Sequence, residues 1–120
     1  MPTVQQLLVA NLSEVFGTRD PAARAAAAAD IYTEDVRFTD PEGSSTGRDG
    51  LLAAAAALFD RAPQDFVFAA EGPSYIGNGD AAGTQAWTFG PAGAPVVHGI
   101  DVITVRDGRI ATLDTLVGGA

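Results

Sequence analysis

Asp101 is the residue of this sequence best placed to do chemistry, because it interrupts an otherwise apolar run, VVHGIDVITV. A carboxylate at such a position must be paired, protonated or facing a cavity, since burying it unpaired is costly and usually raises its pKa. A neutral buried carboxylic acid is a hydrogen-bond donor. The alternative is an aspartate exposed at a sheet edge or paired with Arg106 or Arg109.

A second carboxyl group, Asp40, is predicted at the end of a short strand. Val36 and Phe38 alternate with polar residues, and Asp40 continues their phase before Pro41 ends the strand. The pattern places Asp40 on the apolar side of the strand. Two carboxyl groups on apolar strand faces are suited to general acid–base chemistry.

Three further polar residues have two interpretations each. Asn11 lies in the apolar stripe of a predicted helix, so its amide faces the interior and either caps a neighbouring loop or donates to a ligand. Glu71 is either a solvated strand end or an inward second base. His98 lies three residues from Asp101, on the opposite face of the same strand, and is either satisfied at a packing or subunit interface or part of a site.

Helices are predicted in the first half of the chain and strands in the second. Apolar spacing and capping signals, including Asp20 followed by Pro21, predict helices over residues 4–16, 20–32 and 48–61 around the strand 36–40. Alternating patterns and Gly-rich turns then predict strands over residues 66–71, 74–78, 83–89, 96–106 and 109–117. This order predicts an α+β fold in which three helices cover one face of a curved antiparallel sheet.

The last hairpin leaves two registers open. A two-residue turn at Asp107-Gly108 places Asp101 opposite Asp114, whereas a three-residue turn places it opposite Leu113. We favour the second register. Because both phases of the strand around Asp101 are apolar, we also expect both of its faces to be covered, one by helices and the other by a second sheet or a second subunit. The second of these alternatives corresponds to a homodimer.

Composition excludes several classes of function. The length of 120 residues and a hydrophobic content of 47% predict one domain over 1–120. A net charge of −8 argues against binding to nucleic acid or an anionic membrane. The chain has no cysteine and a single histidine, so we expect no metal and no cofactor. Without a signal-peptide pattern or a long apolar stretch, we expect a soluble cytoplasmic protein.

Two segments resemble a known family. IYTEDVRFTDPEGSSTGRDGL, with its Asp-Pro strand end, and HGIDVITVRDGRI are similar to the ketosteroid isomerase and SnoaL-like branch of the nuclear-transport-factor-2-like superfamily. The resemblance covers nearly the whole chain and implies a cone-shaped fold around an apolar pocket. It implies that Asp40 is a general base which shuttles a proton and that Asp101 is an oxyanion donor; the neutral donor carboxyl of these isomerases is a well-known example of pKa tuning by an apolar site.

The first helix departs from the isomerase pattern, because it lacks the tyrosine that donates to the oxyanion. Asn11, Leu12 or Phe16 occupies that place, while Tyr32 matches a tyrosine that supports the site. Loss of one such donor lowers the rate by about 10² to 10³-fold. The residues expected to contact an apolar small-molecule substrate are Asn11, Tyr32, Phe59, Trp87, His98 and Leu113.

The leading hypothesis is therefore a steroid Δ-isomerase-like enzyme acting on an apolar ketone. One alternative is a SnoaL-like polyketide cyclase or an epoxide-opening cyclase or hydrolase, in which Asp40 pairs with Glu71, Asp101 or His98. The other is a domain that binds small molecules without catalysis.

Overall fold

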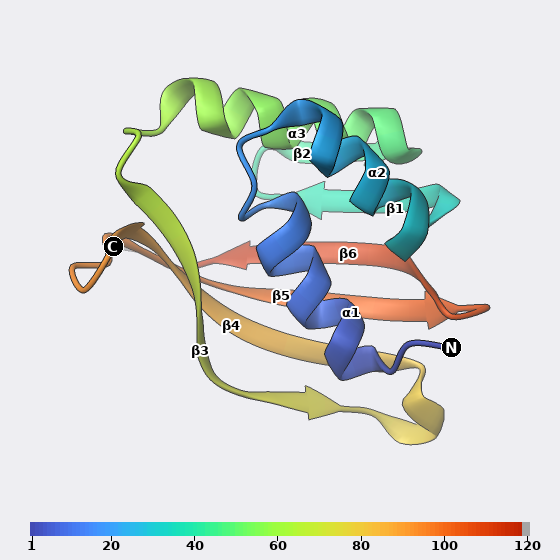
Figure 1. Cartoon of the computed structure of the whole chain (residues 1–120). Coiled ribbons are helices and arrows are strands. Elements are labelled where there is room, and N and C mark those ends of the chain that lie inside the picture. Colours follow the sequence, from blue (N-terminus) through green and yellow to red (C-terminus); the bar gives the residue numbers. More distant parts are fainter. Residues whose placement is uncertain (119–120) are drawn as a thin grey trace.

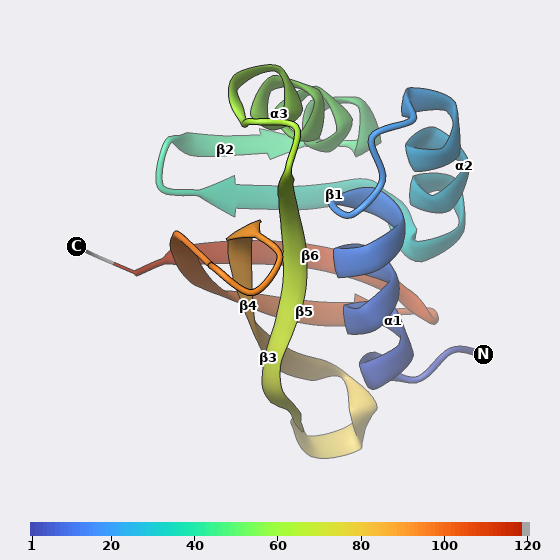
Figure 2. The same cartoon turned by 60° about the vertical axis from the view of Figure 1, so that its left-hand side comes forward.

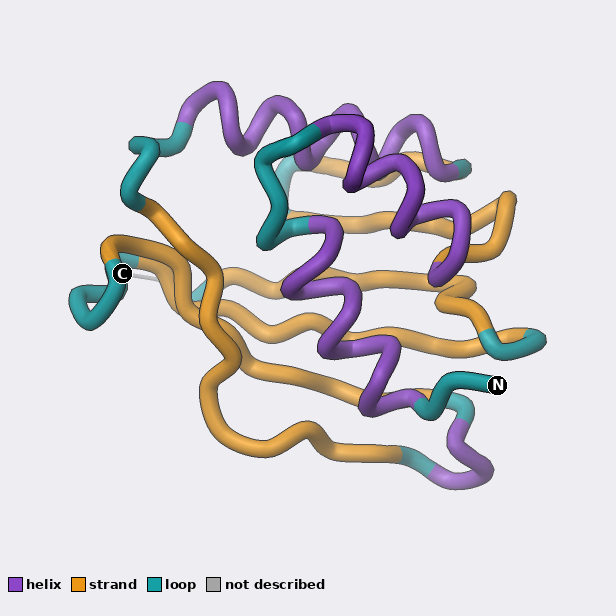
Figure 3. Tube along the Cα trace, in the orientation of Figure 1, coloured by secondary structure: helices purple, strands orange, loops and turns teal. Residues whose placement is uncertain are grey.

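The computed structural model describes residues 1–118 and has the predicted α+β architecture, with helices packed on one face of a six-stranded sheet (Figures 1 and 3). The helical elements are α1 (Val4–Ala10), the π-helical turn η1 (Asn11–Val15), α2 (Pro21–Ile31), α3 (Arg48–Arg61) and the short 3-10 turn η2 (Asn78–Asp80). The strands are β1 (Tyr32–Asp40), β2 (Gly43–Thr46), β3 (Phe66–Ile76), β4 (Ala82–Pro91), β5 (Val97–Arg106) and β6 (Arg109–Val117).

The sheet has the order β2-β1-β6-β5-β4-β3. All neighbouring strands are antiparallel except β1 and β6, which are parallel, so the sheet is mixed and not antiparallel throughout. Strand β3 bends strongly and crosses the direction of β1 and β6 in Figure 2, which curls one end of the sheet toward the helices. Its pairing with β4 is irregular between Glu71 and Tyr75, so one bent strand replaces the two short strands predicted there.

Two of the three predicted helices, those over residues 20–32 and 48–61, form close to their predicted bounds. Asp20 caps α2 by accepting a hydrogen bond from the backbone N–H of Ala22 at 3.2 Å, as predicted, and α3 spans the predicted residues. The first helix differs from the prediction, because it continues beyond Ala10 as a π-helical turn in which the N–H of Phe16 donates to the carbonyl of Asn11. Such turns are frequent at functional sites.

The β5–β6 hairpin has neither of the two predicted registers. Its turn is the two-residue Asp107-Gly108, both with positive φ, and Arg106 pairs with Arg109. One extra residue in β6 then shifts the pairing between Thr104 and Val105, so that Asp101 lies opposite Thr115. The favoured pairing of Asp101 with Leu113 was wrong, because a bulge of this kind has no reliable local sequence signal.

The main core lies between the helices and the inner face of the sheet. Leu113, predicted as a substrate contact, is fully buried in it, together with side chains from α1, α3 and β5. A smaller cluster formed by Leu12, Trp87 and Phe89 lies where β3 and β4 curl toward the helices. This second cluster borders the candidate site.

Candidate functional site

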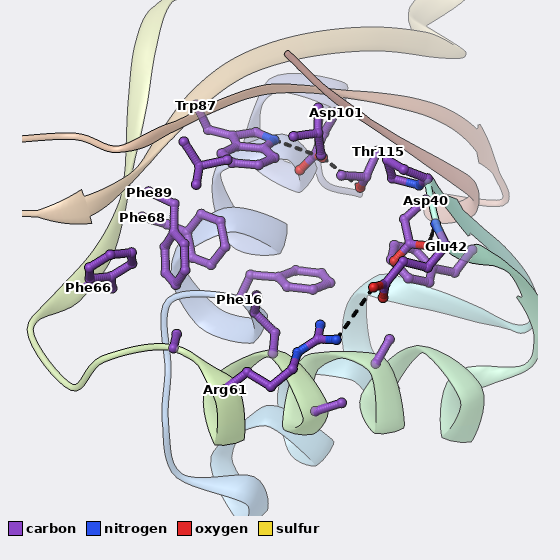
Figure 4. A pocket seen from close by; sticks show the side chains of 18 of the residues that line it. Phe16, Asp40, Glu42, Arg61, Phe66, Phe68, Trp87, Phe89, Asp101 and Thr115 are labelled. Atoms are coloured by element: carbon purple, nitrogen blue, oxygen red, sulfur yellow. Dashed lines mark hydrogen bonds and ion pairs between the residues drawn. The ribbon is translucent and has the colours of Figure 1, made fainter. Parts of the chain in front are cut away.

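A pocket of about 680 Å³ opens beside the smaller cluster, between the curled sheet and the last turns of α3. Figure 4 shows Trp87, Asp101 and Thr115 together on one side of it, with Phe66, Phe68 and Phe89 to one flank and Asp40 and Glu42 to the other. Six of its lining residues are aromatic: Phe16, Phe38, Phe66, Phe68, Trp87 and Phe89. The walls therefore suit an apolar and largely flat molecule.

Asp101 is the buried carboxyl group of this pocket. It lies on the inward face of β5, and only 5% of its surface is exposed. Its Oδ1 accepts hydrogen bonds from Trp87 Nε1 at 3.0 Å and Thr115 Oγ1 at 2.9 Å, and its Oδ2 accepts one from Asn11 Nδ2 at 3.0 Å. Burial raises the pKa of Asp101 to about 6, while the three donors oppose that rise by stabilising the carboxylate.

Gly99 makes room for the indole that contacts Asp101. Trp87 on β4 is paired with Gly99 on β5, and a Cβ atom at position 99 would lie 2.2 Å from the Trp87 ring. The ring can therefore lie across β5 only because residue 99 has no side chain. Because the ring lies over Gly99, its N–H reaches Asp101, which is two residues further along β5.

Thr115 owes its position to the bulge in β6. The shifted register places it directly opposite Asp101, and it lines the pocket as well. Without the extra residue, Asp114 would be the partner of Asp101. Sequence reasoning missed Thr115 for this reason, since threonine in a strand is unremarkable and only the register reveals its neighbour.

Asn11 and Tyr32 form a hydrogen-bonded chain that reaches Asp101 from the protein interior. Both are fully buried, and the Tyr32 hydroxyl donates to Asn11 Oδ1 while Asn11 Nδ2 donates to Asp101. Burial, and secondarily the negative charge of Asp101, raise the pKa of Tyr32 well above its usual value, so this phenol stays a donor. Neither residue lines the pocket. The Asn11 amide thus neither caps a loop nor faces the pocket: it joins Tyr32 to Asp101.

Asp40 lies at the rim of the same pocket, at the end of β1. Its Oδ1 accepts the backbone N–H groups of Glu42 at 2.9 Å and Gly43 at 3.1 Å, which stabilises the turn into β2. The exposed Glu42 forms an ion pair with Arg61 of α3, with 3.5 Å between Oε1 and Nη1. Asp40 and Asp101 therefore share one cavity, with charged groups at its rim.

Other residues expected to contact a substrate lie elsewhere. Phe59 packs against the guanidinium groups of Arg19 and Arg24, whose Cζ atoms lie 4.8 and 5.1 Å from the ring centroid. His98 lies on the outer face of the sheet, where its Nδ1 is 3.7 Å from Glu71 Oε1. Neither Phe59, His98 nor Glu71 lines the pocket. As expected, His98 and Asp101 project to opposite faces of β5.

Within residues 1–118, no group of three or more histidine or acidic side chains is arranged to hold a metal ion. No helix in this part of the chain is long and apolar enough to cross a membrane.

The fold and the pocket are those of a cone-shaped α+β protein of the nuclear-transport-factor-2-like class. Comparison with known proteins shows to which family of this class the chain belongs. The sequence-family model of the SnoaL-like domain matches residues 9–113 of this chain, so the chain belongs to the SnoaL-like family. No curated protein is significantly similar to it in sequence.

Several solved structures have the same fold. A proposed isomerase of the SnoaL-like family from Agrobacterium tumefaciens has a TM-score of 0.84 and 23% identity, with 94% of this chain and 95% of that chain covered. A proposed ketosteroid isomerase from Kribbella flavida has a TM-score of 0.66 and 18% identity, covering 98% and 78%. A proposed polyketide cyclase from Sinorhizobium meliloti has a TM-score of 0.68 and 18% identity, covering 96% and 94%. At these identities the similarity establishes the fold alone.

Proposed function

We propose that the protein is an enzyme that moves a proton on an apolar carbonyl compound bound in the pocket. The observation that carries the proposal is Asp101, a buried carboxyl group that faces an aromatic cavity and has a pKa of about 6. A carboxyl group with this pKa can both take and return a proton near neutral pH.

The directions of the hydrogen bonds favour Asp101 as the general base. Trp87 can only donate, and Asn11 presents its amide N–H₂ to the carboxyl group. Both oxygens of Asp101 thus accept hydrogen bonds, as the ionised form requires. The resemblance instead assigns the base to Asp40 and the oxyanion donor to Asp101. We retain Asp40 as the second carboxyl group of the site, at the rim.

Proton abstraction next to a carbonyl is the first step of either an isomerisation or an aldol-type cyclisation. Return of the proton to another carbon gives a Δ-isomerase, whereas attack of the enolate on a second carbonyl gives a cyclase. Epoxide opening would need a separate acid and base. Of the residues named for that alternative, Glu71 and His98 lie outside the pocket, so the remaining pair is Asp40 and Asp101.

The proposal extends to a homodimer formed through the outer face of the sheet. On this face Ile100 and Leu116 are paired across β5 and β6, and 42% and 55% of their surfaces are exposed. Large apolar side chains that neighbour each other on a sheet face favour burial against a partner.

The direct test is turnover of a Δ5-3-ketosteroid, followed by conjugated-enone absorbance, together with deuterium uptake by 2-tetralone in D₂O. We expect Asp101→Asn to lose at least about 10²-fold in kcat for both probes while still binding them. Wild-type activity should rise with pH through about 6, because the base must be ionised.

Asp40→Asn serves as the matched variant, since it removes a carboxyl group from the same pocket. If Asp40 is the base, as the resemblance implies, this variant loses the activity and Asp101→Asn keeps a larger share of it. Activity that falls as pH rises through 6 would identify protonated Asp101 as a donor and contradict its role as base. Normal deuterium uptake by Asp101→Asn would refute proton transfer through this residue.

A further inference from the structure

Thr115 differs from the other partners of Asp101 in two respects. It lines the pocket, as Trp87 does but Asn11 does not. Unlike Trp87, it has a hydroxyl group that can reverse its role, because a hydroxyl oxygen both donates and accepts while an indole N–H only donates. In the described structure, Thr115 donates to Asp101 Oδ1 at 2.9 Å.

Protonation of Asp101 therefore changes the hydrogen bonds that the Thr115 hydroxyl group can form. When the carboxylate gains a proton on Oδ1, its new O–H can donate to Thr115 Oγ1. The Thr115 O–H is then free to turn away from Asp101 and toward the pocket. Neither Trp87 nor Asn11 provides such an exchange, because both face the carboxyl group with N–H donors.

We propose that Thr115 is a catalytic residue whose hydroxyl group donates to the substrate oxygen as Asp101 takes the proton from the adjacent carbon. This inference rests on the proposed function. The C–H bond breaks and its proton forms an O–H bond on Asp101. The electron pair of that C–H bond forms a C=C bond to the carbonyl carbon, and the π pair of the C=O bond moves to the oxygen, where the Thr115 O–H stabilises the negative charge. Return of the proton to carbon reverses each of these changes.

The geometry suits two neighbouring atoms of one substrate. Thr115 and Asp101 are directly opposite each other on adjacent strands, with 2.9 Å between their interacting oxygens. An α-carbon and its carbonyl oxygen are likewise close neighbours, separated by two bonds. Thr115 thereby fills the role of the donor that the first helix lacks, since that helix has no tyrosine and Asn11 is occupied behind Asp101.

The test compares Thr115→Val, which keeps the branched shape, with Thr115→Ser, which keeps the hydroxyl group. The readouts are deuterium uptake by 2-tetralone and the affinity for 2-naphthol, an aromatic enol with a similar shape. We expect Thr115→Val to lower kcat about 10²-fold with little change in KM, as loss of an oxyanion donor does. Its affinity for 2-naphthol should fall about tenfold, and Thr115→Ser should restore both values to within about threefold.

The pH profile separates catalysis by Thr115 from a supporting role. Loss of its hydrogen bond also raises the pKa of Asp101, because that bond stabilises the carboxylate. If Thr115 only tunes this pKa, activity of the valine variant returns to the wild-type level at higher pH, which would overturn the inference. A deficit that persists at every pH supports it. Thr104→Val, an exposed threonine on the outer face of β5, is the control and should leave both readouts unchanged.

Failure of the inference and failure of the proposed function give different results. If the wild-type protein neither catalyses deuterium uptake by 2-tetralone nor binds 2-naphthol, the proposed function is refuted, and the inference is refuted with it. If the wild type is active and Thr115→Val matches it at all pH values, only the role of Thr115 is refuted.

Discussion

Asp101 experiences two opposing effects. Burial disfavours its charge, while hydrogen bonds from Trp87, Thr115 and Asn11 favour it. The result is a pKa of about 6, above the ordinary value of 3.8 but low enough for the carboxylate to predominate at neutral pH. Each donor therefore influences both the position of the carboxyl group and its readiness to take a proton.

The raised pKa predicts how stability depends on pH. Folded Asp101 binds its proton more tightly than the unfolded chain does, so its favourable contribution is complete below pH 3.8 and is lost as pH rises through about 6. The shift corresponds to about 3 kcal/mol. Between pH 4 and 8, the free energy of unfolding of the wild type should decrease relative to that of Asp101→Asn by up to this amount.

Urea denaturation of both proteins across this range measures the difference. Asp101→Asn removes the titrating group, so its stability curve is the reference for the pH effects of all other groups in the wild type. Two curves that stay parallel from pH 4 to pH 8 would show that Asp101 titrates alike in the folded and unfolded chains.

At the scale of secondary structure, the close contact between β4 and β5 controls the site. Gly99→Ala would place a Cβ atom 2.2 Å from the Trp87 ring and force the indole away from Asp101. We expect a loss of stability of about 1 to 3 kcal/mol and a shift of tryptophan fluorescence to longer wavelength. Gly77→Ala is the control, because its Cβ would make an ordinary contact at 3.4 Å. Equal fluorescence spectra for the two variants would contradict the packing argument.

Elements with local signals could be predicted from the sequence. Asp20, Pro21 and the alanine-rich stretch define α2 within a few residues. Apolar alternation identified Asp40, and a continuous apolar run identified Asp101. Features that depend on distant pairing could not be predicted in this way. The bulge in β6, which brings Thr115 to Asp101, and the parallel pairing of β1 with β6 arise from contacts between segments far apart in the chain.

Phe59 and Trp87 illustrate the same limit for side chains. Both are large aromatic residues in regular elements, so composition and periodicity treat them alike. The structure places Trp87 on the pocket wall, whereas Phe59 packs against Arg19 and Arg24. Which face of α3 meets the pocket depends on how the helix packs, and its many alanines leave that face weakly marked in the sequence.

At the scale of the whole molecule, the outer face of the sheet predicts the oligomeric state. If Ile100 and Leu116 meet a second copy, Ile100→Lys should convert a dimer into a monomer in sedimentation velocity, because it would place a charge in an apolar interface. Val9→Lys makes the same change of charge at a similarly exposed position on α1 and should leave the dimer intact. A wild-type monomer at high protein concentration would refute the dimer.

The position of β6 in the sheet has a consequence for folding kinetics. This strand is the last of the six in chain order, yet it joins β1 on one side to β5 on the other. Until β6 docks, the β2–β1 hairpin has no strand partner in the rest of the sheet. The hydrogen bond from Thr115 to Asp101 is then missing as well. Such non-local pairing slows folding. In refolding from denaturant, the ability to bind a ligand should therefore appear only in the final step, together with the complete sheet.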